Sequence, residues 1–369
     1  MAKVVKRAYK FRCYPSPEQA VELSRTFGCV RLVWNKALDA RQRRYATESK
    51  STTYVQASAE LTGWKKSEDL GFLNEVSSVP LQQTLRHQQA AFAAFFAKRA
   101  RYPRFKSRKR SRASAEYTRS GFRWRDGQLT LAKMTEPLDI RWSRALPEGA
   151  APSTVTVSRD SAGRWFVSLL VEETIATLAS TTNTVGVDVG LNSLAALSTG
   201  EKITNPRHER ADRRKLAKAQ RVLARKVKES NNREKARRKV ARIHARITDR
   251  RTDFLHKLST RLIRENQAVA IEDLAVRNMV ANHTLARAIS DASWRQLRTM
   301  LEYKADWYGR EVLVVDRWYP STRVCSHCGA LGEKLSLGVR EWMCRRCGVV
   351  HDRDVNAARN ILAAGLAER

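Results

Sequence analysis

Two Cys-x-x-Cys pairs near the end of the chain most strongly constrain what it can fold into. The first pair is Cys325 and Cys328, and the second, after fifteen further residues, is Cys344 and Cys347. Four thiolates at this spacing are typical of a zinc ribbon, in which each pair supplies two sulfurs to one tetrahedral ion. Two disulfides are the alternative, but disulfides are rare inside cells, where the composition places this chain. The spacing therefore predicts one Zn²⁺ site.

A ribbon with four sulfur ligands leaves no open coordination position, so its zinc is expected to be structural. His327 and His351 flank the cysteines, and we expect them beside the site or on the ribbon surface rather than among the ligands. The chemistry is therefore expected to lie with an acid that follows the ribbon, Asp354.

The charge of the chain indicates a polyanionic partner. Its 369 residues include 70 Lys and Arg against 37 Asp and Glu, a net charge of +33. Such an excess favours binding to phosphate, because contact releases condensed counterions. An anionic membrane would also fit, but no apolar run approaches the ~20 residues of a spanning helix, and no short apolar segment follows the basic N-terminus. We therefore expect a nucleic-acid-binding protein in the cytoplasm, associated with the nucleoid.

The first half of the chain changes its hydrophobic period twice. Residues 1–16 alternate as a strand does, residues 17–100 follow a helical period that begins after Ser16, and residues 101–174 return to a period of two. Two hairpins are expected in the last segment, one of them around Asp126-Gly127. These patterns predict a small β-barrel interrupted by a helical bundle, with residues 175–184 as a linker to a second domain.

Basic and aromatic residues are interleaved between positions 98 and 125. Arg104, Lys106 and Arg108 represent the basic side chains, and we expect them to contact nucleic acid because phosphates are neutralised there while bases stack on exposed rings. For the aromatic residues, stacking on bases and packing into the neighbouring sheet remain equally good interpretations. These aromatic residues are Tyr102, Phe105, Tyr117, Phe122 and Trp124.

The second half places acids at the ends of apolar segments. Asp188 lies in the first apolar strand, Glu272 and Asp273 end a later one, and Asp354 opens the last helix. The predicted order of strands and helices is that of an RNase H-like α/β domain, in which such acids converge. Carboxylates are ligands for Mg²⁺, and two such ions about 4 Å apart can act on a phosphodiester. A salt bridge to an arginine is the alternative for each acid alone.

A helical hairpin is expected between the first two acidic strands. Residues 201–250 hold nineteen Lys and Arg against six Asp and Glu, a net charge of +13. A charge run is often only a solvated helical face, but this imbalance favours contact with phosphate.

Taken together, these motifs resemble the TnpB family, the RNA-guided nucleases encoded by insertion sequences and related to type V CRISPR effectors. The resemblance is carried by the segments 185–190, 271–274, 325–328, 344–348 and 351–358, in that order, and it extends over nearly the whole chain. It implies that Asp188, Glu272 and Asp354 are the catalytic acids of a RuvC-type nuclease and hold two Mg²⁺ ions. Asp354 is preferred to Asp352, because the family's acid stands directly before x-Asn-Ala-Ala.

The resemblance also implies a domain plan. A wedge-like barrel would comprise residues 1–16 and 101–174, and a recognition bundle residues 17–100. The RuvC-like nuclease would comprise residues 185–318 and 351–369, interrupted by a zinc ribbon that loads the target strand at residues 319–350.

A guide RNA and a double-stranded DNA target are the partners that the resemblance implies, with a short motif beside the target read by the protein. Tyr54 and Gln82 stand where the family contacts that motif. A polar surface of the bundle is nearly as good an interpretation of both residues. Ser78 and Val79 depart from a basic–apolar pair of some members, which leaves the identity of the motif open.

Three hypotheses follow for the function. The first is an RNA-guided, Mg²⁺-dependent DNA endonuclease. The second is a nuclease-inactive relative that regulates by RNA-guided binding, which would be expected to have lost one of the acids. The third is a strand-transfer transposase on the same RNase H-like fold, which usually lacks a ribbon before the last acid.

Overall fold

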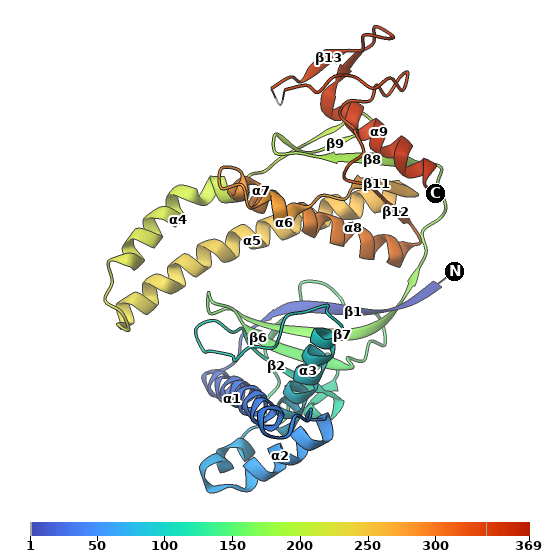
Figure 1. Cartoon of the computed structure of the whole chain (residues 1–369). Coiled ribbons are helices and arrows are strands. Elements are labelled where there is room, and N and C mark those ends of the chain that lie inside the picture. Colours follow the sequence, from blue (N-terminus) through green and yellow to red (C-terminus); the bar gives the residue numbers. More distant parts are fainter. Residues whose placement is uncertain (1, 337) are drawn as a thin grey trace. The chain divides into compact units, whose positions relative to one another are not determined.

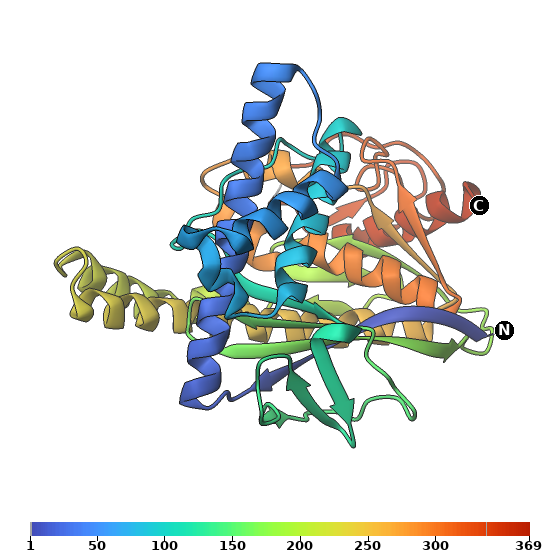
Figure 2. The ribbon, with the colours of Figure 1, turned by 90° about the horizontal axis from the view of Figure 1, so that it is seen from below.

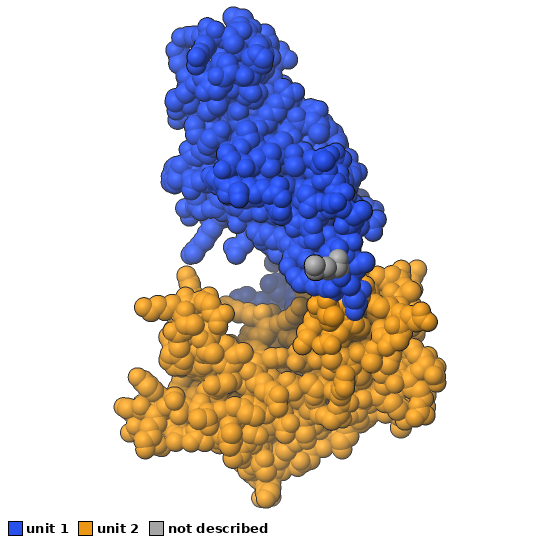
Figure 3. Space-filling model, turned by 90° about the vertical axis from the view of Figure 1, so that its right-hand side faces the viewer, with its two compact units in different colours: residues 1–3, 174–369 blue, residues 4–173 orange. Residues whose placement is uncertain are grey.

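We describe the chain from a computed structural model, and the description covers residues 2–336 and 338–369. The chain divides into two compact units, residues 4–173 and residues 174–369 together with the first three, which have different colours in Figure 3. Each unit has a sheet and a core of its own. Among the described helices, none combines the length and the apolar character needed to cross a membrane.

The unit of residues 4–173 combines three long helices with a five-stranded sheet. Its helices are α1 (Pro17–Glu48), α2 (Tyr54–Lys66) and α3 (Ser78–Phe96), with the short 3-10 helices η1 (Glu68–Asn74) and η2 (Arg119–Gly121). Its strands are β1 (Ala2–Cys13), β2 (Ala113–Thr118), β3 (Phe122–Arg125), β4 (Gln128–Leu131), β5 (Ile140–Arg141), β6 (Thr154–Arg159) and β7 (Trp165–Ala176).

Helix α1 begins where the sequence predicts. The Ser16 hydroxyl accepts a hydrogen bond from the Gln19 backbone N–H at 3.2 Å, and the Gln19 side chain accepts one from the Ser16 N–H at 3.0 Å. This capping box satisfies two N–H groups that would otherwise lack partners, and Pro17 fits the first turn because it has no N–H to lose. The helices then bury apolar side chains such as Leu23, Leu81 and Leu85 against the sheet.

The predicted closed β-barrel is wrong. The five strands lie in the order β2-β6-β7-β1-β5, and among the described residues the edge strands β2 and β5 do not pair with each other. Strands β3 and β4 instead form a separate hairpin, whose Leu129 and Leu131 are buried in the same core. Because β5 has only two residues, it offers too short a ladder to close the sheet, and the hairpin covers the core through its side chains.

The unit of residues 174–369 has a mixed sheet covered by helices, so the predicted α/β character is confirmed. Its sheet strands are β8 (Thr184–Val189), β9 (Ser193–Leu197), β10 (Lys202–Thr204), β11 (Ala268–Glu272) and β12 (Glu311–Val315). Its helices are α4 (His208–Ala224), α5 (Asn231–Glu265), α6 (Val276–Met279), α7 (Ala286–Ala292), α8 (Trp294–Tyr308) and α9 (Arg353–Ala367). Two short strands, β13 (Glu341–Met343) and β14 (Val350–Asp352), pair beside the cysteines.

The sheet of this unit has the order β10-β9-β8-β11-β12. Strand β9 pairs antiparallel with both β10 and β8, whereas β11 pairs parallel with both β8 and β12. Helix α9 covers one face, and α5 and α8 cover the other (Figure 1). Burial on both faces explains why β11 reads as an uninterrupted apolar run, Ala268 to Ile271, before its acid.

Helix α9 lies unusually close to β8, and Gly186 is the reason. A Cβ atom at this position would lie 2.0 Å from the carbonyl oxygen of Ala358, a distance that real atoms do not reach. The glycine therefore lets the backbone of α9 approach the strand at Ala358 and Leu362.

The predicted helical hairpin is present as α4 and α5, which lie side by side and project from their unit (Figure 1, Figure 2). Ser230 caps α5 by accepting a hydrogen bond from the Arg233 N–H at 3.1 Å. The buried carboxylate of Asp212 on α4 binds Arg246 at 2.7 Å and Arg250 at 3.4 Å on α5, which ties the two arms together.

Candidate functional site

The four cysteines form one compact cluster. Their sulfur atoms all lie within 4.8 Å of one another, with Cys325 and Cys347 at 3.7 Å and Cys328 and Cys344 at 3.7 Å. A disulfide would need sulfurs about 2 Å apart. A tetrahedron of sulfurs around zinc with bonds of about 2.3 Å has edges of about 3.8 Å. The donor set and its spacing therefore fit a structural Zn²⁺ ion, as the sequence predicts.

His351 lies beside this cluster rather than in place of a ligand. Its buried Nε2 atom is 3.0 Å from the sulfur of Cys325. A histidine N–H that donates to a thiolate stabilises the negative charge of the sulfur. Groups that surround metal ligands commonly make such hydrogen bonds.

The three predicted catalytic acids come from three different elements. Asp188 lies in β8 and Glu272 ends β11, and the parallel register that pairs Val187 with Ile271 places these acids next to each other. Asp354 lies in the first turn of α9, the helix whose later residues Ala358 and Leu362 pack on β8 at Gly186.

Burial and mutual repulsion act on these carboxylates. Burial raises the pKa of Asp188 well above its ordinary value, and the nearby charges of Glu272 and Asp354 raise it further. Burial also raises the pKa of Glu272, although a hydrogen bond from Ser321 opposes that shift. Among the described residues, the carboxylate oxygens do not gather within 4.8 Å as the cysteine sulfurs do. Carboxylates whose ionised forms are disfavoured by burial and by neighbouring negative charges would be stabilised by a bound cation.

Asp352 and Asp273, the acids beside Asp354 and Glu272, have other partners. Asp352 caps α9 by accepting a hydrogen bond from the Val355 N–H at 3.0 Å, and it pairs with Lys202 at 2.5 Å. Asp273 pairs with Arg298 and Arg317, which lower its pKa. These structural roles favour Asp354 and Glu272 as the acids that remain for chemistry.

Asp354 itself has a cationic neighbour in the segment between the two cysteine pairs. Its carboxylate lies 3.5 Å from the guanidinium of Arg340, which is half exposed. The contact brings a positive charge from the cysteine segment beside the acid.

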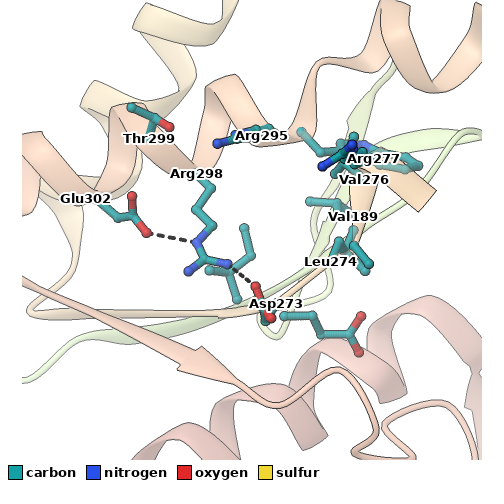
Figure 4. A pocket seen from close by; sticks show the side chains of 13 residues that line it. Val189, Asp273, Leu274, Val276, Arg277, Arg295, Arg298, Thr299 and Glu302 are labelled. Carbon is teal, nitrogen blue, oxygen red and sulfur yellow. Dashed lines mark hydrogen bonds and ion pairs between the residues drawn. The ribbon is translucent and has the colours of Figure 1, made fainter. Parts of the chain in front are cut away.

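A cavity of about 370 Å³ borders Glu272 (Figure 4). On its wall, Arg298 bridges Glu302 and Asp273, so both of these acids are neutralised. Arg277 and Arg295 also line the cavity, and no described acid pairs with either. Three arginines and three acids therefore line the cavity, so positive side chains balance the acidic ones there.

The basic segment of the other unit is anchored rather than free. The Trp34 indole N–H donates to the Arg104 carbonyl at 2.9 Å, and the Asn35 side chain exchanges hydrogen bonds with the backbone of Lys106 at 2.8 and 2.9 Å. The Lys106 ammonium lies 3.8 Å from the centre of the Trp34 ring, and burial lowers its pKa. The segment is therefore held along α1 and is not a simple solvated loop.

A cavity of about 320 Å³ lies beside this segment. Its basic lining residues come from α1, the segment after Arg104 and β6, and no acidic side chain lines it. These basic residues are Arg31, Lys106, Arg108, Arg112 and Arg159.

The aromatic residues of the segment divide between the two interpretations that the sequence left open. Tyr117 is fully buried, and Phe122 and Trp124 pack against the core. Tyr102 and Phe105 are exposed, although Tyr102 also contacts aromatic rings of α3. Among these five residues, Tyr102 and Phe105 are the most exposed and are therefore the best placed to offer a ring face to a base.

Tyr54 and Gln82 lie on neighbouring helices. Tyr54 opens α2, and its hydroxyl accepts a hydrogen bond from Arg86 of α3 at 3.4 Å. Gln82 is exposed on α3, one turn before Arg86 and so on the same helical face. The two predicted residues therefore share one surface, and the structure adds Arg86 to it.

Sequence reasoning missed several residues around the acids. No motif marks these residues, which are Ser321, Arg340, Arg277 and Arg295, and Ser321 lies 49 positions from the acid that it contacts. Arg340 stands four residues before Cys344, so its position in the predicted ribbon is the sequence feature that could have pointed to it.

Models of known families match three segments of the chain. Residues 167–283 match OrfB_IS605, described as "Probable transposase", and residues 294–361 match a "Cas12f1-like, TNB domain". Residues 1–50 match a "Helix-turn-helix domain", although the described residues there form strand β1 and the single helix α1.

Relatives align along almost the entire chain. A candidate RNA-guided DNA endonuclease of Streptomyces pristinaespiralis is 71% identical over 367 residues, which is 100% of this chain and 91% of the relative. InsQ of Escherichia coli K12, also named a candidate RNA-guided DNA endonuclease, is 34% identical. The alignment covers 98% of this chain and 92% of InsQ. In fold, the chain is similar to Cas12f1, solved in its complex with guide RNA and target DNA. The TM-score is 0.53 and the identity 13%, over 97% of this chain and 98% of Cas12f1.

Proposed function

Because this chain belongs to the TnpB family, we propose that it is an RNA-guided DNA endonuclease. A guide RNA and a double-stranded DNA target would be its partners, with base pairing to the guide reading most of the target. The single observation that carries the proposal is the convergence of Asp188, Glu272 and Asp354 from two strands and a helix.

The three acids would be the catalytic residues. Their unit would be an RNase H-like RuvC domain, which the mixed sheet order and the acid positions support. Two Mg²⁺ ions held by Asp188, Glu272 and Asp354 would activate water for in-line attack and neutralise the leaving 3′ oxygen. The carboxylates would orient these ions, and the adjacent cavity with Arg277 and Arg295 would hold the backbone of the strand to be cut.

The remaining parts of the chain would divide the work of recognition. Residues 319–350 would form the zinc-ribbon insertion that loads the target strand. The bundle of residues 17–100, with Tyr54 and Gln82, would read the motif beside the target. Residues 1–16 and 101–174 would hold the guide RNA, and the anchored segment with Arg104, Lys106 and Arg108 supports this placement.

A cleavage assay tests the proposal. The ribonucleoprotein would be purified with the RNA of its native locus and incubated with Mg²⁺ and a plasmid that carries a guide-matched target beside a randomised flank. We expect guide-dependent cutting that EDTA stops and that Asp354→Ala abolishes, whereas Asp253→Ala, which removes an exposed acid of α5, should cut normally.

Other results would redirect the assignment. Cutting that persists in Asp354→Ala, or that needs no guide, would rule out this active site. A protein that binds the matched target without cutting it would be an RNA-guided regulator, and joining of DNA ends would indicate a transposase.

A further inference from the structure

A chain of hydrogen bonds runs from the cysteine cluster to Glu272. It begins at Ser321, four residues before Cys325, whose hydroxyl donates to the Glu272 carboxylate at 2.5 Å. Ser321 is 4% exposed, whereas Glu272 is partly exposed and borders the cavity described above. The contact joins two residues that lie 49 positions apart, and it fixes one oxygen of Glu272 relative to the segment that enters the ribbon.

Two asparagines of α9 hold that segment in place. The Asn360 side-chain amide donates to the carbonyl of Ser321 at 2.7 Å and to the carbonyl of Val324 at 2.6 Å. The amide of Asn356 donates to the same Val324 carbonyl at 2.8 Å. Both asparagines are buried, and they stand four residues apart on one face of α9.

The clamp continues into the first metal-binding turn. The Asn356 side-chain oxygen accepts a hydrogen bond from the backbone N–H of Ser326 at 2.9 Å. Ser326 directly follows Cys325, so Asn356 holds the backbone on both sides of that cysteine. Asp354 lies two residues before Asn356 in the same helix, so one rigid element carries an acid and the clamp.

We propose that Ser321 is a positioning residue for Glu272 and that Asn356 and Asn360 couple the folded zinc ribbon to the Mg²⁺ site. The inference rests on the proposed function, because it takes Glu272 as a Mg²⁺ ligand. Zinc would fix the turn at Cys325, the asparagines would fix the segment from Ser321 to Val324, and the Ser321 hydroxyl would fix the carboxylate. Outer partners of metal ligands typically change metal affinity by about 10–100-fold when removed.

Ser321→Ala tests the hydrogen bond to Glu272, because it deletes the donating hydroxyl while Asn356 and Asn360 still hold the backbone of the segment. The ribonucleoprotein should need about tenfold more Mg²⁺ for half-maximal cleavage, with its rate largely recovered at saturating Mg²⁺. Binding of Mn²⁺, measured by electron paramagnetic resonance, should weaken by a similar factor. Zinc content and guide-dependent DNA binding should stay unchanged.

Thr322→Ala is the matched control, since it removes the neighbouring hydroxyl, which makes no hydrogen bond among the described residues. It should leave the Mg²⁺ requirement as in the unmutated protein. Asn360→Ala, in protein that retains one zinc, should raise the Mg²⁺ requirement like Ser321→Ala, because the segment is then held by Asn356 alone.

The outcomes separate the inference from the proposed function. If the acids are required for cleavage but Ser321→Ala has an unchanged Mg²⁺ requirement and Mn²⁺ affinity, the positioning role is refuted. If Ser321→Ala weakens Mn²⁺ binding and Asn360→Ala does not, the coupling to the ribbon is refuted. If Asp354→Ala still cuts, the proposed active site fails first.

Discussion

The cysteine cluster and the acidic cluster are two candidate metal sites built in opposite ways. The four sulfurs come from two short turns of one ribbon and already lie at the separations of a zinc tetrahedron. The three carboxylates come from β8, β11 and α9, and their charges raise the pKa of Asp188. The cysteine cluster is local in sequence and already has the spacing of a zinc site. The acidic cluster is assembled from distant elements of the sheet and helix, and its carboxylates repel one another.

This difference teaches what each site does for the protein. Neutral thiols can be buried without a metal at modest cost in folding free energy. Zinc that binds only the folded ribbon then adds its binding free energy to the stability of the fold. Buried carboxylates beside one another cost stability unless a cation is present, and such a cost is accepted at sites that bind cations for chemistry. We therefore expect substitutions in the two sites to separate structure from catalysis.

The largest expected effect is a double dissociation between the two sites. Asp188→Ala should abolish cleavage, since the remaining acids cannot hold two ions, yet it should retain about one zinc per chain. Cys344→Ser should lose the zinc and lower the melting temperature of the protein. Elemental analysis, thermal unfolding and plasmid cleavage, performed on both variants, measure the three quantities.

Similar behaviour of Asp188→Ala and Cys344→Ser would contradict the contrast between the two sites. Zinc near zero in the reduced, unchelated, unmutated protein would show that the cysteines are only buried thiols. Loss of zinc in Asp188→Ala would show that the two clusters form a single site.

A smaller effect is expected at the basic segment, which lies outside both metal sites. Reversing the charges of Arg104, Lys106 and Arg108 to Glu should weaken RNA retention far more than it lowers thermal stability, and the stability that is lost should come from Lys106, whose contact with the Trp34 ring is removed. If each residue contacts one phosphate, the slope of log K against log salt should become shallower by about 2–3. Filter binding over a range of salt concentrations measures this slope.

Control substitutions in the same unit sharpen that result. Reversing Arg43, Lys50 and Lys66, which are exposed on or beside the helices, changes the net charge equally. Equal loss of RNA in both triple variants would indicate a diffuse charge effect, and unchanged retention in the first would mean that the segment carries no RNA contact.

Local patterns allowed the two candidate metal sites to be proposed, because each candidate ligand is marked by its immediate neighbours. The cysteines follow a fixed spacing, and Asp188 and Glu272 stand in or at the end of apolar strands whose burial makes a carboxylate conspicuous. The capping box at Ser16 and the hairpin of α4 and α5 are local as well. The structure confirms the capping box and the helical hairpin, whereas the catalytic role of the acids stays a prediction.

Features that depend on distant pairing could not be predicted in this way. Alternation in residues 101–174 indicates strands, but whether their edges meet depends on lengths and registers that alternation does not encode. The burial of Tyr117 and the exposure of Phe105 likewise depend on which sheet face meets the helices. The bond from Ser321 to Glu272 spans 49 positions and has no sequence pattern.

The smallest expected effect is a gain of stability from removing an acid. Because the pKa of Asp188 is raised in the folded state, folding favours its protonated form, so its contribution to stability falls as pH rises from its ordinary pKa of about 3.9 toward the raised value. Asp188→Asn removes this cost at neutral pH. In EDTA the variant should melt at a higher temperature, by about 2–4 °C for each kcal/mol gained. The gain should shrink as the pH approaches about 4, where both proteins are neutral at this position.

Magnesium should reverse the order of the two proteins. Added Mg²⁺ stabilises the unmutated protein by binding only its folded state, and Asp188→Asn should gain less. Calorimetry of both proteins at several pH values, with and without Mg²⁺, measures the effect, and Asp253→Asn controls for loss of an exposed acid. A lower melting temperature for Asp188→Asn in EDTA at neutral pH would mean that Asp188 stabilises the metal-free fold. The contrast between a relaxed zinc site and a strained acidic site would then be wrong.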